Sequence, residues 1–179
     1  MTRFAVLLTT VVVLSFAPHS QGFAQSVGEK TGVNSTLGIT PKTEDFVTEV
    51  AISDMFEIES SKPAAEKGSA SEKTFAAQMI TDHTKTSTEL KGMISGGKVK
   101  ANLPTGLDSA HQSKLDKLKA ATGDDFVKTY ASEQVSAHKD AVNLFERYAK
   151  GGDNADLKSW ASETLPTLRH HLEMAQDLK

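Results

Sequence analysis

Apolar residues recur along most of this chain at the spacing of an amphipathic α-helix. Four long segments between residue 43 and the C-terminus show this period, and a glycine or a pair of glycines ends each of the first three. Outside residues 1–24, no segment alternates with a period of two, and β-branched residues do not cluster in strand-like runs. The sequence therefore predicts an all-α protein.

Capping residues and helix breakers indicate where the helices begin and end. Thr43 is expected to cap the first helix, which carries Glu44 and Asp45 in its first turn. Pro63 lies inside this helix, where we expect a kink or break, and Pro166 lies inside the last one. The four helices are expected at residues 43–67, from 69 or 71 to 95, at 123–150, and from beyond 153 or 154 to the C-terminus.

The connections between these helices differ in length. Short turns join the first two helices and the last two, whereas residues 96–122 form a long crossover with a short, weakly amphipathic helix at 108–121. Two hairpins joined by one long crossover predict a ferritin-like four-helix bundle with up-down-down-up connectivity. An irregular α-helical array is the alternative.

The N-terminus has the layout of a secretory signal peptide. Arg3 is followed by an apolar run at 4–17, and Gly22, Phe23 and Ala24 precede the expected cleavage after Ala24. The apolar run has about 14 residues, whereas a membrane span takes about 20, so we favour cleavage over an uncleaved anchor. Residues 25–42 are rich in Gly, Ser, Thr and Asn and are expected to form a flexible leader before a bundle domain at 43–179.

Composition narrows the classes of function. Without residues 1–24 the chain carries 19 basic and 23 acidic side chains, and no basic patch points to a nucleic-acid partner. The absence of cysteine excludes disulfides, thiolate metal sites, a cysteine nucleophile and a lipidated N-terminal cysteine. We expect a periplasmic or secreted protein with no membrane span in the mature chain, and the sequence does not predict its oligomeric state.

Each of the four predicted helices carries one ionisable residue on its apolar face. In the segment 75–90, the residue that continues the apolar stripe is a histidine. The third and fourth helices also carry a histidine on this face, and the first carries a glutamate. The four candidate site residues are Glu57, His83, His138 and His171.

Helix geometry indicates which of these side chains share a layer. We counted about 1.5 Å per residue from each turn and assumed that both turns lie at one level. On that basis Glu57, His83 and His138 share a layer, and His171 lies a turn or more deeper. A staggered hairpin, or a shift at Pro166, would bring His171 into the same layer.

Two interpretations account for inward-facing histidine and glutamate side chains. Buried imidazoles and carboxylates need partners, so the four residues either bind a transition metal (Zn, Fe, Cu or Mn) or form a metal-free hydrogen-bonded network. No Glu-x-x-His spacing is present. Asp82 should point about 100° away from His83, as a surface or supporting group. His111 and His170 are expected to be exposed.

The sequence around these residues resembles a known family. The patterns "F…A…M…DH…L" across 75–90, "F…Y…H…F" across 126–145 and "A..TLP.L..HL" across 161–172 are similar to the bacterial domain-of-unknown-function family 4142 (DUF4142). The resemblance covers about residues 43–178 and implies an exported, ferritin-like four-helix protein. It places the family's glutamate at Glu57 and its histidines at His83, His138 and His171. It implies no established reaction, and the di-iron signature of catalytic ferritin-like proteins is missing here.

We therefore expect an exported binding protein with a metal ion or small ligand held by the inward residues. The alternative is a structural or stress-related interaction protein with a pH-sensitive histidine network. A metal-dependent hydrolase or oxidase is the third reading, but it needs a general base beside an open coordination position, and no residue clearly supplies one. No catalytic residue is predicted.

Overall fold

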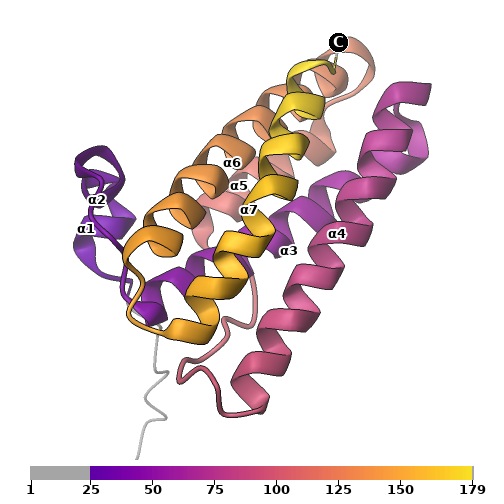
Figure 1. Cartoon of the computed structure of the whole chain (residues 1–179). Helices are drawn as coiled ribbons and strands as arrows, with labels where there is room; N and C mark the ends of the chain where they lie inside the picture. Colours follow the sequence, from indigo (N-terminus) through magenta and orange to yellow (C-terminus); the bar gives the residue numbers. More distant parts are fainter. Residues whose placement is uncertain (1–24, 179) are drawn as a thin grey trace, which may run out of the picture.

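The computed structural model describes residues 25–178, so the expected signal peptide and its cleavage site lie outside the described residues. The described chain is all-helical, as the sequence predicts, and residues 25–178 contain no strand (Figure 1). None of the helices in this part is long and apolar enough to cross a membrane. The helices are α1 (Val27–Lys30), α2 (Val33–Leu37), α3 (Thr43–Lys67), α4 (Ala70–Ser95), α5 (Ser109–Ala120), α6 (Gly123–Gly151) and α7 (Ala155–Gln176).

Most ends of the long helices lie within one or two residues of the expected positions, and local capping fixes the starts of α4 and α7. The cap expected at Thr43 was wrong, because Thr43 is the first residue of α3 and Lys42 is the N-cap, without a side-chain hydrogen bond. The last helix ends at Gln176, short of the C-terminus. The Ser69 hydroxyl accepts a hydrogen bond from the Glu72 N–H, and the Glu72 carboxylate accepts one from the Ser69 N–H. The Asn154 side chain caps α7 in the same way by accepting from the Leu157 N–H. The break considered at Pro63 is absent, and α3 continues through it to Lys67. Burial of the residues around Pro63 stabilises the helix by more than the loss of one backbone hydrogen bond at the proline costs.

The long helices form two hairpins, α3 with α4 and α6 with α7, which bury two hydrophobic clusters. The first cluster joins the start of α3, the end of α4, the end of α6 and the start of α7; its aromatic side chains are Phe46, Phe145, Tyr148 and Trp160. The second joins the end of α3, the starts of α4 and α6 and the end of α7; its aromatic side chains are Phe75, Phe126 and Tyr130. The α3–α4 turn and the α6–α7 turn therefore lie at opposite ends of the molecule, and the assumption of one common level was wrong.

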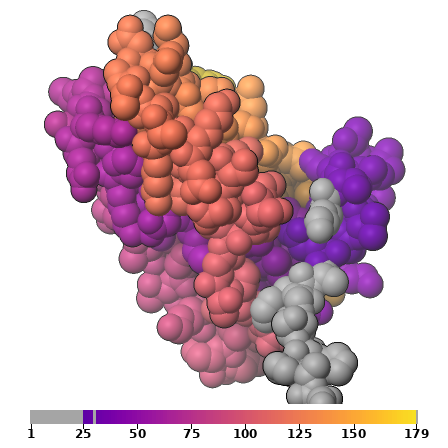
Figure 2. Space-filling model, turned by 180° about the vertical axis from the view of Figure 1, so that it is seen from behind, coloured from indigo at the N-terminus to yellow at the C-terminus, as the bar shows by residue number. Residues whose placement is uncertain are grey.

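The crossover returns along the outside of the hairpins. Its helix α5 contacts both α3 and α6, and Leu118 of α5 belongs to the second hydrophobic cluster. Figure 2 shows this face, with the crossover running along it and the leader standing at one side.

Residues 25–42 differ from the aperiodic leader that the sequence predicts, since they contain α1 and α2. Arg147 of α6 is buried, and both of its terminal nitrogens donate to the Glu29 carboxylate, at 2.9 and 3.1 Å. The Ser26 N–H donates to Asp45 at the start of α3 at 2.9 Å. A buried guanidinium requires a charged partner, and the leader provides it. Polar contacts of this kind leave no hydrophobic period in a sequence.

Candidate metal centre

Three buried histidines from three helices meet between the two hydrophobic clusters. His83 lies on α4, His138 on α6 and His171 on α7, and their exposed fractions are 3%, 1% and 2%. The ring centroids are 5.6 Å apart for His83–His138, 5.6 Å for His83–His171 and 5.4 Å for His138–His171. One ring nitrogen of each histidine lies within 4.8 Å of the other two. The three imidazoles thus form one compact group.

One nitrogen of each ring, called the outer nitrogen below, makes a hydrogen bond of 2.8 Å to an acceptor. His83 Nδ1 bonds Asp54 Oδ1, His171 Nε2 bonds Asp82 Oδ2, and His138 Nδ1 bonds the backbone oxygen of Gln134. A carbonyl or carboxylate oxygen only accepts, so in each case the outer nitrogen carries the proton. The remaining nitrogen of each neutral ring then presents a lone pair.

Within residues 25–178, these remaining nitrogens have no hydrogen-bond partner. His83 Nε2, His138 Nε2 and His171 Nδ1 are all buried and unpaired. A buried polar atom without a partner costs about 1–3 kcal/mol, and native proteins contain few of them. Three in one group, each with a lone pair when its ring is neutral, form the donor set that a transition-metal ion binds.

Further hydrogen bonds hold the outer acceptors in place. Asp54 Oδ2 accepts from the Thr86 hydroxyl at 2.9 Å and from the Ser87 hydroxyl at 3.0 Å. Asp82 Oδ2 also accepts from the Gln78 amide at 2.6 Å. Carboxylates that orient the outer nitrogen of a histidine are usual around protein metal sites, where they fix the tautomer and raise the basicity of the ligand.

Sequence reasoning had assigned Asp82 a supporting or surface role, and the structure shows that it bonds His171. It missed Asp54, because only one ionisable residue was sought on each helix. The signal was nevertheless present: Asp54 precedes Glu57 by three residues, so the two carboxylates lie on the same face of α3.

Glu57 is buried beside the three-histidine group but is not one of the converging donors. Its side chain is 1% exposed, and its Oε1 lies 3.9 Å from His138 Nδ1, on the side of the ring that bonds Gln134. In the described part of the chain neither carboxylate oxygen has a partner at hydrogen-bond geometry, and the nearby Gln134 side chain acts on the pKa of Glu57 only by lowering it in part. Burial raises the pKa of Glu57 to about 7, and the nearby His83 partly opposes this shift.

The protonation of the histidines follows from the same surroundings. Burial, followed by repulsion from His83, lowers the pKa of His138 to about 3. Burial also lowers the pKa of His171, against the hydrogen bond to Asp82. Burial alone would lower the pKa of His83, but the hydrogen bond and charge of Asp54 raise it. His138 and His171 are therefore neutral near pH 7, the state in which imidazole binds metals.

The structure brings His171 together with His83 and His138, so the expectation that it lies a turn or more deeper was wrong. His138 and His171 belong to the same hairpin, so the opposite positions of the two turns change only where His83 lies relative to this pair. The other histidines lie elsewhere: His170 is exposed, and His111 is half-buried on α5, where it bonds Asp108 at 2.9 Å.

Fold and centre together define an all-helical protein with a buried group of three histidines. The family described as "Domain of unknown function (DUF4142)" matches residues 28–178, and the chain belongs to this family. The match begins inside α1, so it includes most of the leader as well as the long helices. No curated protein and no solved structure matches the chain.

Proposed function

We propose that this protein binds a divalent first-row transition-metal ion through His83, His138 and His171. The observation that carries the proposal is the set of three buried, unpaired nitrogens on rings whose outer nitrogens are all engaged. Imidazole nitrogens bind Zn, Fe, Cu and Mn, and the experiment below identifies which of these ions the protein binds.

The size of the group supports this proposal. Metal–nitrogen bonds of about 2.1 Å place two tetrahedral ligands roughly 3.4 Å apart. The three donors lie within 4.8 Å of one another, so small side-chain rotations bring them to bonding distance. A metal-free network would satisfy these nitrogens by bonds among the rings, and the absence of any partner for them within residues 25–178 favours the metal.

We propose Glu57 as the fourth ligand, which it becomes by turning from the Nδ1 side of His138 toward the three unpaired nitrogens. It is buried, both of its oxygens are unpaired, and its negative charge would offset that of the ion. The protein is then a binding protein that holds an ion with three neutral imidazoles and one carboxylate. We propose no general base and no catalytic activity for this centre.

We also propose a bundle topology and a cellular location for this protein. Two hairpins with turns at opposite ends and one long crossover support the ferritin-like, up-down-down-up bundle. The N-terminal sequence supports export, by cleavage after Ala24, to the periplasm or the cell exterior.

Thermal melting of chelator-stripped protein tests the metal proposal. An ion that binds only the folded chain adds about 2.7 kcal/mol of stability when its free concentration is a hundredfold above Kd. We expect one of Zn, Cu, Fe or Mn to raise Tm, and His83→Ala, His138→Ala and His171→Ala each to abolish the rise. His111→Ala and His170→Ala are the controls. If no ion raises Tm, or if a control removes the rise while the buried substitutions leave it, the proposal fails.

Glu57→Gln in the same assay tests the fourth ligand. The metal-free variant should be more stable than the wild type, on the order of 1 kcal/mol, because an unpaired buried amide costs less than an unpaired buried carboxylate. The stabilisation by metal should decrease. An unchanged metal response would show that the three histidines bind the ion without Glu57.

A further inference from the structure

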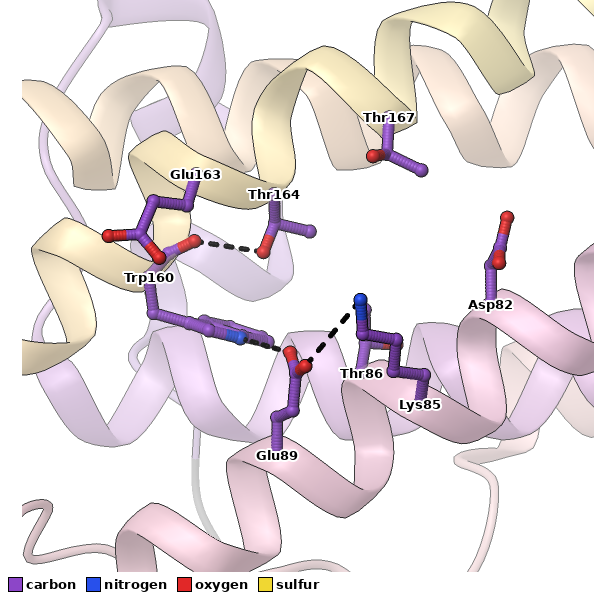
Figure 3. Close-up of a pocket in the computed structure, with 8 residues that line it drawn as sticks. All are labelled: Asp82, Lys85, Thr86, Glu89, Trp160, Glu163, Thr164 and Thr167. Carbon is purple, nitrogen blue, oxygen red and sulfur yellow. Dashed lines mark hydrogen bonds and ion pairs between the residues drawn. The ribbon is translucent and has the colours of Figure 1, made fainter.

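We propose that the metal ion reaches and leaves the three-histidine centre through the cleft between α4 and α7, with Asp82 as the first ligand that it meets inside. This inference rests on the proposed metal binding and adds the route. The cleft has a volume of about 240 Å³ and opens to solvent. Side chains of α4 line one side and side chains of α7 the other (Figure 3).

Two short chains of hydrogen bonds join this cleft to the centre. Asp82 lines the cleft and bonds His171 directly, at 2.8 Å. Thr86 also lines the cleft, and its hydroxyl donates to Asp54, which in turn bonds His83. Two of the three metal-binding histidines are therefore one or two hydrogen bonds away from the cleft.

Asp82 is half-buried and is the most accessible of the residues that bond the three histidines. Its side chain is 23% exposed, whereas that of Asp54 is 5% exposed and Gln134 is fully buried. Both protein hydrogen bonds of the Asp82 carboxylate go to Oδ2, from His171 and Gln78. No group within residues 25–178 bonds Oδ1, so this oxygen is available to an arriving cation.

The helices beside the cleft also leave room for passage. α4 and α7 belong to different hairpins, and each packs much more closely against its hairpin partner than against the other. A cation that moves between α4 and α7 therefore disturbs neither the α3–α4 interface nor the α6–α7 interface.

The charges around the cleft favour cations. Asp82, Glu89 and Glu163 line it together with one lysine, Lys85. Glu89 Oε2 accepts from the Trp160 indole at 2.8 Å, and Glu89 Oε1 lies 3.8 Å from Lys85 Nζ (Figure 3). A cleft with excess negative charge concentrates cations and raises their association rate.

Stopped-flow binding of Co²⁺ to chelator-stripped protein tests the route. Thr167→Trp places a large ring in the cleft without replacing a proposed ligand or a hydrogen-bond partner of a histidine. A blocked route slows entry and exit equally, so we expect association and dissociation rates to fall about tenfold or more while Kd stays unchanged. Thr84→Trp is the matched control, since Thr84 is exposed on α4 and does not line the cleft.

A second variant tests the charge of the cleft. Glu163→Lys should slow Co²⁺ association about tenfold at low salt, and the difference should vanish at high ionic strength. If Thr167→Trp leaves both rates at wild-type values, if it changes only one of them, or if Thr84→Trp slows binding equally, the route is wrong although the centre still binds metal. If the wild-type protein binds neither Co²⁺ nor any of Zn, Cu, Fe and Mn at equilibrium, the proposed function itself fails and the route falls with it.

Discussion

At the scale of the residue, each imidazole in the centre owes its state to the partner of its outer nitrogen. Asp54 is the most strongly held of these partners, because two hydroxyl donors from α4 fix its second oxygen. Its charge makes His83 a better donor and holds its ring toward the other two. If the centre binds metal as proposed, part of its affinity therefore comes from a residue that is not itself a ligand.

Asp54→Asn should weaken metal binding by about 10- to 100-fold and leave the helical content unchanged. The amide is similar in size to the carboxylate, but it lacks the charge that favours the ligating tautomer and basicity of His83. Isothermal titration of the chelator-stripped variant with Zn²⁺ measures the change.

The chain contains a matched control for this substitution. Asp108 bonds His111 on the surface at 2.9 Å, in the same type of Asp–His pair, and also caps α5. Asn caps a helix as well as Asp does, so Asp108→Asn should leave both stability and metal affinity unchanged. Equal losses of affinity in the two variants would show that Asp54 has no specific role.

At the scale of the element, the leader is a docked part of the fold. The ion pair between Glu29 and Arg147 attaches it to α6, and Glu49 of α3 lies close enough to both for their charges to act on it. Periodicity predicted α3 to α7 because each buries an apolar stripe. It could not predict α1 and α2, since these are held by polar contacts and expose Val27, Val33 and Leu37.

Glu49 makes the stability of the contact between the leader and the long helices depend on pH. Burial, followed by repulsion from Glu29, raises the pKa of Glu49 from 4.5 to about 7, against the attraction of Arg147. Between these pH values the folded chain holds a proton that the unfolded chain has lost. The free energy of unfolding therefore falls as pH rises from 4.5 to 7, and the penalty is fully present above pH 7.

Glu49→Gln should remove this penalty. We expect the variant to match the wild type near pH 4.5 and to exceed its free energy of unfolding above pH 7, by on the order of 2 kcal/mol. Urea unfolding at a series of pH values measures the difference. Glu44→Gln, on the exposed face of the same helix, is the control. A Glu49→Gln variant that is less stable than the wild type at pH 8 would contradict the argument.

At the scale of the whole molecule, the polar centre lies between two hydrophobic clusters and contains side chains from both hairpins. The sequence predicted which residues face inward, because burial follows the helical period. It placed His171 too deep along the axis, because a residue count from a turn does not specify where two facing side chains meet. It did not single out Asp54, although the three-residue spacing from Glu57 puts both carboxylates on one face of α3, and the bond to His83 on α4 shows its role.

This arrangement predicts that metal links the two hairpins mechanically. The proposed ligands His83, His138 and His171 lie on α4, α6 and α7, so local opening of any of these helices must release the ion. Amide hydrogen exchange around the three histidines should therefore slow together, by about a hundredfold when free metal is a hundredfold above Kd. Exchange in α1 and α2, which hold no ligand, should stay unchanged. Mass spectrometry of exchanged peptides with and without Zn²⁺ measures this, with His138→Ala as the control that should lose protection in all three helices at once. Protection confined to a single helix would mean that the ion binds one segment and does not join the hairpins.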